Sequence, residues 1–175
     1  MPTTPIRRAC RAGASISVIG QRSVGPWRHA CVAAARDPVI LLDTTPLVAL
    51  CDPRDSLNAT ALRDLDRLSR QPLLTCAAVL TEACALLPHP VQRRRLQRLL
   101  EEFAVASYPT GDEHVVWREV LDWLQRYAEH DPDWADAYLA VVSGHERRLR
   151  VWTYDREFRT IWRRPDGTRI PLAVS

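Results

Sequence analysis

Four acidic residues stand where an ionised side chain could take part in chemistry: Asp43, Glu82, Asp136 and Asp155. Asp43 ends the run Val39-Ile40-Leu41-Leu42, which is apolar on both faces and too short for a helix. Such a run is typical of a strand buried in a parallel sheet. Asp43 is therefore expected at the carboxyl end of a central strand, where open α/β sheets place their ligands.

The other three acids are expected at the same edge of the sheet. Glu82 lies in a predicted helix that leaves a second strand, Asp136 lies near the start of a later helix, and Asp155 follows another strand. Two carboxylates within about 4 Å repel by about 4 kcal/mol at an effective dielectric constant near 20. Such a cluster must share protons or bind a cation. Mg²⁺ and Mn²⁺ prefer oxygen ligands, so the pattern predicts a site for one of these ions.

Each acid also has a purely structural explanation. Asp43 and Asp155 could be turn residues at strand ends, and Glu82 could be a solvated helix residue. Asp136 could be a first-turn acid that interacts with the helix dipole. Asp133, three residues before Asp136, is a fifth possible ligand, and Glu157 is a similar reserve beside Asp155.

Strands and helices alternate along the chain, which predicts an α/β fold with a parallel sheet covered on both faces. A capping box is expected at Thr110 to Glu113, and Asp131-Pro132 is expected to start the helix that carries Asp136. A last strand with Pro171 inside it would be confined to the sheet edge. The predicted strands are residues 39–42, 73–76, 104–108, 149–153 and 169–174, and the predicted helices include 57–69, 77–87 and 133–147.

The positive charge is concentrated in the N-terminal segment. Residues 1–38 hold six arginines and one acid, a net charge of +5, whereas residues 39–175 hold eighteen arginines and twenty acids, a net charge of −2. We expect residues 1–38 to be a disordered or non-native extension, with a transit peptide as the alternative. Residues 39–175 are then the working domain.

The composition also excludes some classes of protein. No segment has the roughly 20 apolar residues of a membrane span, so no membrane partner is expected. The five cysteines include no close pair of zinc-ligand type, and free thiols in a reducing cytoplasm are the expectation. All 24 basic residues are arginine, which excludes mechanisms that need a lysine.

Four segments in order resemble a PIN-domain ribonuclease, in particular the toxin of VapBC-type toxin–antitoxin pairs. The matching segments run from Leu41 to Leu50, from Thr75 to Leu87, from Trp134 to Ala140 and from Val151 to Phe158. The resemblance implies a three-layer α/β/α sandwich with a central parallel sheet. It differs at Thr45, where many relatives carry glycine, and the family has no counterpart of the N-terminal segment.

The resemblance also implies a function and its residues. Asp43, Glu82, Asp136 and Asp155 would hold Mg²⁺ or Mn²⁺ for RNA hydrolysis, with Thr153 as a polar helper. RNA contacts are expected from Arg156, Arg159, Trp162 and Arg163, which follow Asp155 in the sequence. Expected partners are the RNA substrate, a cognate antitoxin and a second copy of the chain, joined through the apolar face that bears Trp117 and Trp123.

Other readings of Asp43 fit less well or stay open. HAD-type phosphatases and response-regulator receivers need a lysine near the phosphorylated aspartate, and P-loop enzymes need a glycine-rich loop with lysine. The chain has neither. A PIN-like binding module that has lost catalysis and acts through a protein or RNA partner remains the alternative.

Overall fold

The computed structural model describes residues 38–174, which belong to one compact unit. A four-stranded sheet crosses this unit in the order β3-β2-β1-β4, and all three strand pairs are parallel. Ile40 pairs with Leu73 on one side, and Leu42 pairs with Trp152 on the other. The strands are β1 (Val39–Leu42), β2 (Leu73–Thr75), β3 (Ala106–Ser107) and β4 (Leu149–Trp152).

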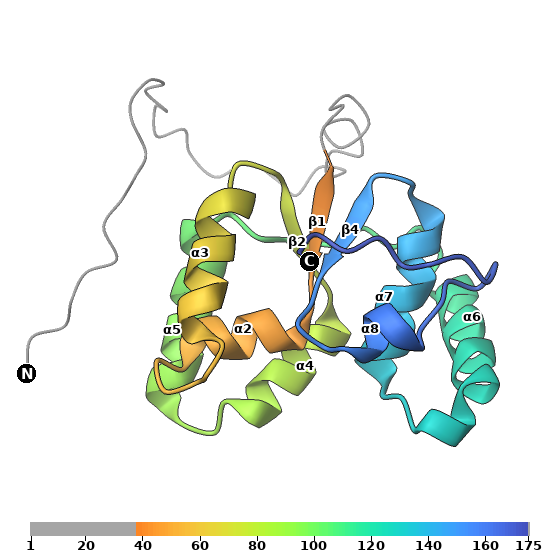
Figure 1. Ribbon diagram of the computed structural model, residues 1–175, viewed down its shortest axis with the longest axis horizontal. Coiled ribbons are helices and arrows are strands. Elements are labelled where there is room, and N and C mark those ends of the chain that lie inside the picture. Colours follow the sequence, from red (N-terminus) through yellow and green to blue (C-terminus); the bar gives the residue numbers. More distant parts are fainter. Residues whose placement is uncertain (1–37, 175) are drawn as a thin grey trace, which may run out of the picture. The chain divides into compact units, whose positions relative to one another are not determined.

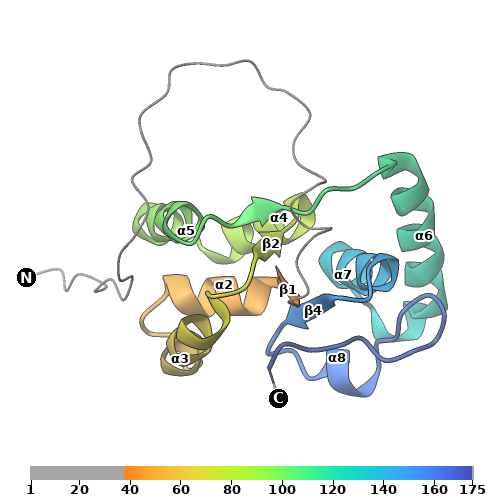
Figure 2. The ribbon, with the colours of Figure 1, turned by 90° about the horizontal axis from the view of Figure 1, so that it is seen from above.

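Helices cover both faces of this sheet, and the predicted three-layer α/β/α architecture is confirmed (Figures 1 and 2). One layer holds α2 (Thr44–Cys51), α3 (Asn58–Leu68) and α5 (Pro90–Glu102). The other holds α6 (Glu113–Arg126), α7 (Trp134–His145) and the short α8 (Glu157–Thr160). Helix α4 (Ala77–Leu86) contacts both α2 and α7, and the 3₁₀ turn η1 (Ala128–His130) joins α6 to α7.

The core is built around β1 and α7. All four residues of β1 are buried, as expected for a strand between two helical layers. Helix α7 is apolar on most of its circumference, and Leu139 and Val142 within it are fully buried. A helix of this kind belongs inside a protein, since each large aliphatic side chain contributes about 1.5–3 kcal/mol when it leaves water. This rigid centre sets the positions of Asp43 and Asp136.

Two predicted helix starts are wrong. Helix α6 is capped by Asp112, whose Oδ1 accepts a hydrogen bond from the His114 amide at 3.0 Å, so Thr110 is not the cap. Helix α7 is capped by Asp133, and Asp131 instead adopts a left-handed conformation with φ of 50° after η1. In both places an aspartate closer to the helix satisfies the free amide groups of the first turn.

The C-terminal segment is not the predicted fifth strand. It makes one parallel bridge to β4, between Leu172 and Val151. The Val151 amide donates to the Pro171 carbonyl at 2.8 Å, and the Ala173 amide donates back to Val151 at 2.9 Å. Pro171 has no amide hydrogen to extend the ladder, which explains why the pairing stays so short.

Other predictions concern the N-terminus, the cysteines and membranes. The predicted extension falls on residues 1–37, which lie outside the described part of the chain, and β1 begins at Val39. Cys51, Cys76 and Cys84 are free thiols, of which the first two are buried. Within residues 38–174, no helix combines the length and apolar character required to cross a membrane.

Candidate active site

Asp43 is a buried carboxylate held by two threonine hydroxyls. It follows β1 directly and is 4% exposed. Its Oδ2 accepts hydrogen bonds from Thr153 Oγ1 at 2.7 Å and from Thr45 Oγ1 at 3.0 Å. Burial nevertheless raises the pKa of Asp43, because the loss of hydration outweighs these hydrogen bonds.

Glu82 lies on α4 and is held by the residue that follows Asp43. Thr44 Oγ1 donates to Glu82 Oε2 at 2.6 Å, which links α2 to α4. The pKa of Glu82 is raised, first by burial and then by the nearby charges of Asp133 and Asp43. Glu82 on α4 and Asp43 at the end of β1 therefore interact electrostatically, although they come from separate segments of the chain.

Asp136 lies in the first turn of α7, within a capping box. Its amide donates to Asp133 Oδ1 at 2.8 Å, and its own Oδ2 accepts from the Asp133 amide at 3.4 Å. Its pKa is raised to about 8, first by burial and then by the charges of Asp133, Asp43 and Asp155. Asp136 is thus close enough to three other acids to be affected by their charge.

Asp155 follows β4 at the same edge of the sheet. Its amide donates to Thr153 Oγ1 at 2.9 Å, and its Oδ1 accepts from the Glu157 amide at 2.9 Å. The same threonine hydroxyl therefore joins Asp155 to Asp43. Glu157 contributes its backbone amide to this arrangement, whereas the carboxylate of Asp133 lies among the interacting acids.

No cation of the described chain neutralises these acids. The salt bridges of residues 38–174 join Arg67 to Asp64, His145 to Glu119 and Arg148 to Glu146, and none includes a carboxylate of this site. Buried like charges of this kind are stable only if some are protonated or a cation is bound. An all-oxygen set of carboxylates and hydroxyls fits Mg²⁺ or Mn²⁺.

The carboxylates point at protein donors rather than at one common centre. Across residues 38–174, no three side chains of the His, Cys, Asp and Glu types lie close enough together to hold a metal ion. Glu82 points to Thr44, Asp43 to Thr153, and Asp136 to the Asp133 amide.

The PIN domain matches residues 40–162, which include all four acids. The chain belongs to the PIN-domain family. A solved structure that is similar to this PIN domain is that of Mycobacterium tuberculosis VapC20, described as a sarcin-ricin loop cleaving toxin. The two share 22% sequence identity and a TM-score of 0.57, over 69% of this chain and 92% of VapC20. That likeness shows a common fold. No curated protein sequence matches the chain significantly.

Two threonines of this PIN domain were missed as site residues. Thr44 holds Glu82, and Thr45 donates to Asp43 while accepting from the Tyr154 amide at 2.9 Å. Thr45 thereby links α2 to Tyr154, two residues past the end of β4. The only signal in the sequence is the pair of hydroxyl residues directly after Asp43.

The predicted base-stacking role of Trp162 is wrong. Its side chain is fully buried and packs edge-on against Trp123, with ring centroids 5.2 Å apart, and against Tyr127 at 5.4 Å. The buried apolar face of α6, which includes Trp123, packs against this ring in the core. Trp123 is also buried, so the exposed face proposed for a dimer retains only Trp117 of the two tryptophans.

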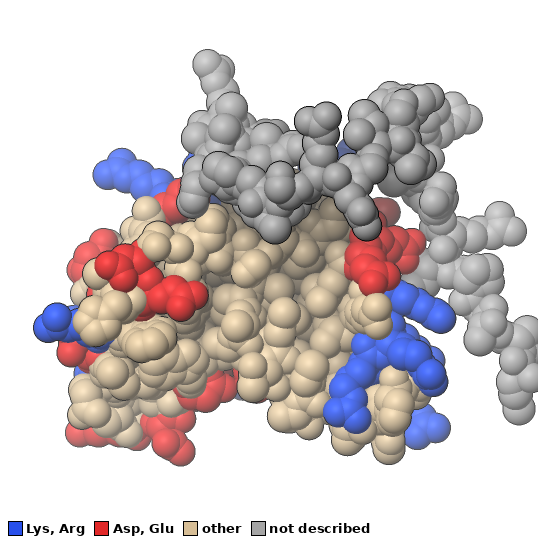
Figure 3. Space-filling view, turned by 180° about the vertical axis from the view of Figure 1, so that it is seen from behind, with Lys and Arg blue, Asp and Glu red and all other residues tan. Residues whose placement is uncertain are grey.

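The predicted arginine contacts differ in their accessibility. Arg156 and Arg159 are exposed on and beside α8, whereas Arg163 is half-buried and donates to the carbonyls of Trp162 and Thr160. A separate basic group lies over α5, at the right of Figure 3. Its exposed arginines are Arg93, Arg94, Arg95 and Arg98. Of these two groups, only the one with Arg156 and Arg159 directly follows a site residue, Asp155, in the sequence.

Proposed function

We propose that this PIN domain, residues 39–175, is a metal-dependent endoribonuclease that hydrolyses RNA phosphodiesters. The observation that carries the proposal is the set of four acids, supplied by four separate segments, that interact at one sheet edge without a cation from the described chain. We assign Mg²⁺ or Mn²⁺ to this site, with Asp43, Glu82, Asp136 and Asp155 as its ligands and Asp133 as a reserve.

When bound, a divalent cation would lower the pKa of an attacking water and offset charge on the phosphate. The protein orients its ligands for this purpose through hydroxyl groups. Thr153 and Thr45 fix the carboxylate of Asp43, and Thr44 fixes that of Glu82. Outer contacts of this kind orient metal ligands in many sites.

The thiol of Cys76 is not suited to act as a covalent nucleophile. Cys76 borders the site at the start of α4, but burial raises the pKa of this thiol to about 11, so it stays protonated at neutral pH. A protonated thiol is a poor nucleophile. This supports direct attack by water on phosphorus.

The likeness to VapC20 supports a narrower role as the toxin of a type II toxin–antitoxin pair. The partners would be an RNA substrate, a cognate antitoxin and a second copy of the chain. Exposed Arg156 and Arg159, next to Asp155, would contact RNA phosphates. A small open reading frame directly upstream of the gene would support the toxin role.

The test is RNA cleavage by the purified full chain with Mg²⁺ or Mn²⁺. Asp43→Asn keeps the shape of the side chain and removes its charge, and it is expected to lower cleavage at least about 100-fold. Asp166→Asn, a change in an exposed carboxylate whose hydrogen bonds come from Thr168, is the matched control and should leave cleavage unchanged. Equal cleavage by Asp43→Asn and the wild type would refute the proposal.

A second candidate is a PIN-like binding module that no longer catalyses. It is favoured by one observation: within the described residues the acids do not converge as a ready-made metal site. This candidate predicts no cleavage of any RNA and no metal binding by calorimetry.

A further inference from the structure

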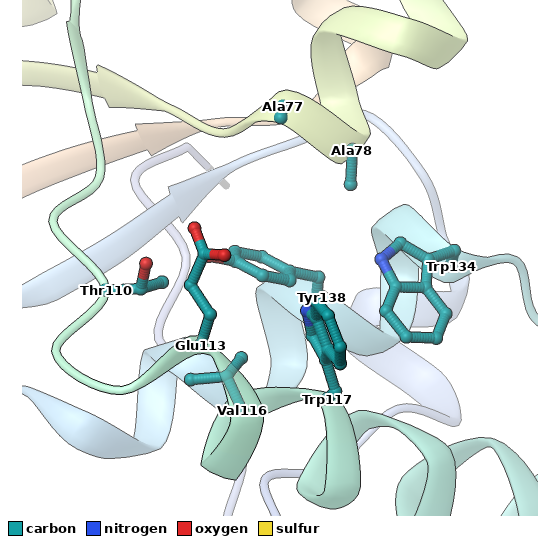
Figure 4. A pocket seen from close by; sticks show the side chains of 8 residues that line it. All are labelled: Ala77, Ala78, Thr110, Glu113, Val116, Trp117, Trp134 and Tyr138. Carbon is teal, nitrogen blue, oxygen red and sulfur yellow. The ribbon is translucent and has the colours of Figure 1, made fainter.

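A hollow of about 220 Å³ lies between the start of α4 and the first turns of α6 and α7 (Figure 4). It is smaller than the roughly 300–1,000 Å³ of pockets that enclose drug-sized ligands, so it suits a single ring system. Its lining residues are Ala77, Ala78, Thr110, Glu113, Val116, Trp117, Trp134 and Tyr138.

Helices α6 and α7 each supply the hollow with two large side chains from one helix face. Glu113 and Trp117 are four residues apart on α6, and Trp134 and Tyr138 are four residues apart on α7. Residues at this spacing share a helix face. Trp117 is 52% exposed and Trp134 is 40% exposed, although indole rings are usually well buried. Both rings border the hollow in Figure 4.

Two acids of the site, Glu82 and Asp136, lie on helices that also line the hollow. Ala78 and Glu82 are also four residues apart, so Glu82 lies one turn further along the same face of α4. Trp134 stands between Asp133 and Asp136 in the first turn of α7. The hollow and two of the acids therefore share α4 and the first turn of α7.

The hollow has one acidic group, the carboxylate of Glu113, and a carboxylate accepts hydrogen bonds. The carboxylate of Glu113 stands beside the Tyr138 ring, and Thr110 lines the same hollow. None of the eight lining residues is basic. The hollow therefore suits a flat group that carries hydrogen-bond donors on its edge.

We propose that this hollow binds a guanine base of the RNA, next to the phosphate that is cleaved. The proposal rests on the proposed nuclease function. Aromatic side chains bind single-stranded RNA by stacking on its bases, here Trp117 and Trp134. Guanine is the RNA base with two adjacent donors on its Watson–Crick edge, N1–H and the N2 amino group, and these match the two oxygens of Glu113 in a bidentate pair.

The experiment compares short single-stranded RNAs that carry guanine, inosine or adenine beside the cleaved bond. Inosine lacks the N2 amino group and keeps the same ring. Cleavage by the full chain gives kcat/KM, and fluorescence anisotropy without metal gives the affinity of each labelled RNA for the same protein.

Trp117→Ala and Trp134→Ala are each expected to lower affinity and kcat/KM for the guanine RNA about 5- to 150-fold. Glu113→Gln should remove most of the preference for guanine over inosine. Leu121→Ala is the matched control, since Leu121 is exposed on α6 but does not line the hollow. Trp117→Phe should restore most of the affinity lost in Trp117→Ala.

The two proposals can fail separately. If the wild type cleaves RNA but neither tryptophan variant changes affinity, the guanine proposal is overturned and the nuclease stands. If the wild type cleaves nothing but binds guanine RNA through Trp117 and Trp134, the nuclease falls and the base pocket stands. Equal affinity for guanine, inosine and adenine RNAs would overturn the guanine assignment, and tryptophan-dependent binding of an arginine peptide instead of RNA would make the hollow a protein-docking site.

Discussion

Asp43 and Asp166 both accept hydrogen bonds from threonine hydroxyls, yet their pKa values move in opposite directions. Asp166 Oδ1 accepts from Thr168 Oγ1 at 2.7 Å and from the Thr168 amide at 2.9 Å, and its pKa is lowered, with the hydroxyl contact as the main cause. Asp43 accepts from two hydroxyls, and its pKa is raised by burial. The difference is hydration, since Asp166 lies in solvent.

The comparison shows what the site lacks. A hydrogen bond to a charged group contributes about 1.5–3 kcal/mol, whereas the effective penalty for burying an ion is several kcal/mol. Threonine hydroxyls therefore lower the pKa of the exposed Asp166, whereas at Asp43 they do not offset the effect of burial. The remaining deficit at Asp43, Glu82 and Asp136 is one of positive charge, which a bound divalent cation would supply.

The largest expected effect is on the pH dependence of stability without metal. Asp136 keeps its proton in the folded protein up to about pH 8, whereas its ordinary pKa is 3.8. Between these values the folded state binds more protons than the unfolded state, so the free energy of unfolding falls as pH rises. Allowing for partial exposure of the carboxylate, we expect a loss of about 3 kcal/mol across this range.

Asp136→Asn should remove most of that loss, as measured by urea unfolding with a chelator present at several pH values. Asp166→Asn should leave it intact, because the pKa of Asp166 moves the other way. If Asp136→Asn has the same pH dependence as the wild type, titration of Asp136 is not its cause.

A smaller effect is expected from the threonines. Thr153→Val keeps the shape of a fully buried side chain and removes one hydrogen bond to Asp43. It should weaken Mn²⁺ binding and RNA cleavage about 10- to 100-fold, as for other groups that orient metal ligands. Thr168→Val removes the same contact from Asp166 and should change neither. Equal effects of Thr153→Val and Thr168→Val would contradict the claim that only the hydroxyl beside Asp43 orients a metal ligand.

The fold was largely predictable because its signals are local. The buried run of β1 and the alternation of strands with helices indicated the parallel sheet, and the apolar character of the segment after Asp133 indicated α7. Helix starts were harder, since several aspartates and threonines near each start could serve as caps. Asp112 and Asp133, which stand directly before the two helices, are the residues that cap them.

The acids of the site were also predictable, but their surroundings were not. A carboxylate at the end of a buried strand stands out in a sequence, whereas a threonine beside it does not. The link from Thr45 to Tyr154 spans 109 positions and depends on how β1 and β4 pair. The burial of Trp162 is of the same kind, since its aromatic partners lie far back in the chain on α6 and the residues after it.

The central claim is that the acids of this sheet edge bind a divalent cation. Calorimetric titration of Mn²⁺ into the metal-free full chain tests it directly, with Asp43→Asn and Asp166→Asn as the matched pair. The account predicts saturable binding to the wild type and to Asp166→Asn, and an affinity at least about 10-fold weaker in Asp43→Asn. No saturable binding to the wild type, or equal binding by Asp43→Asn, would contradict it.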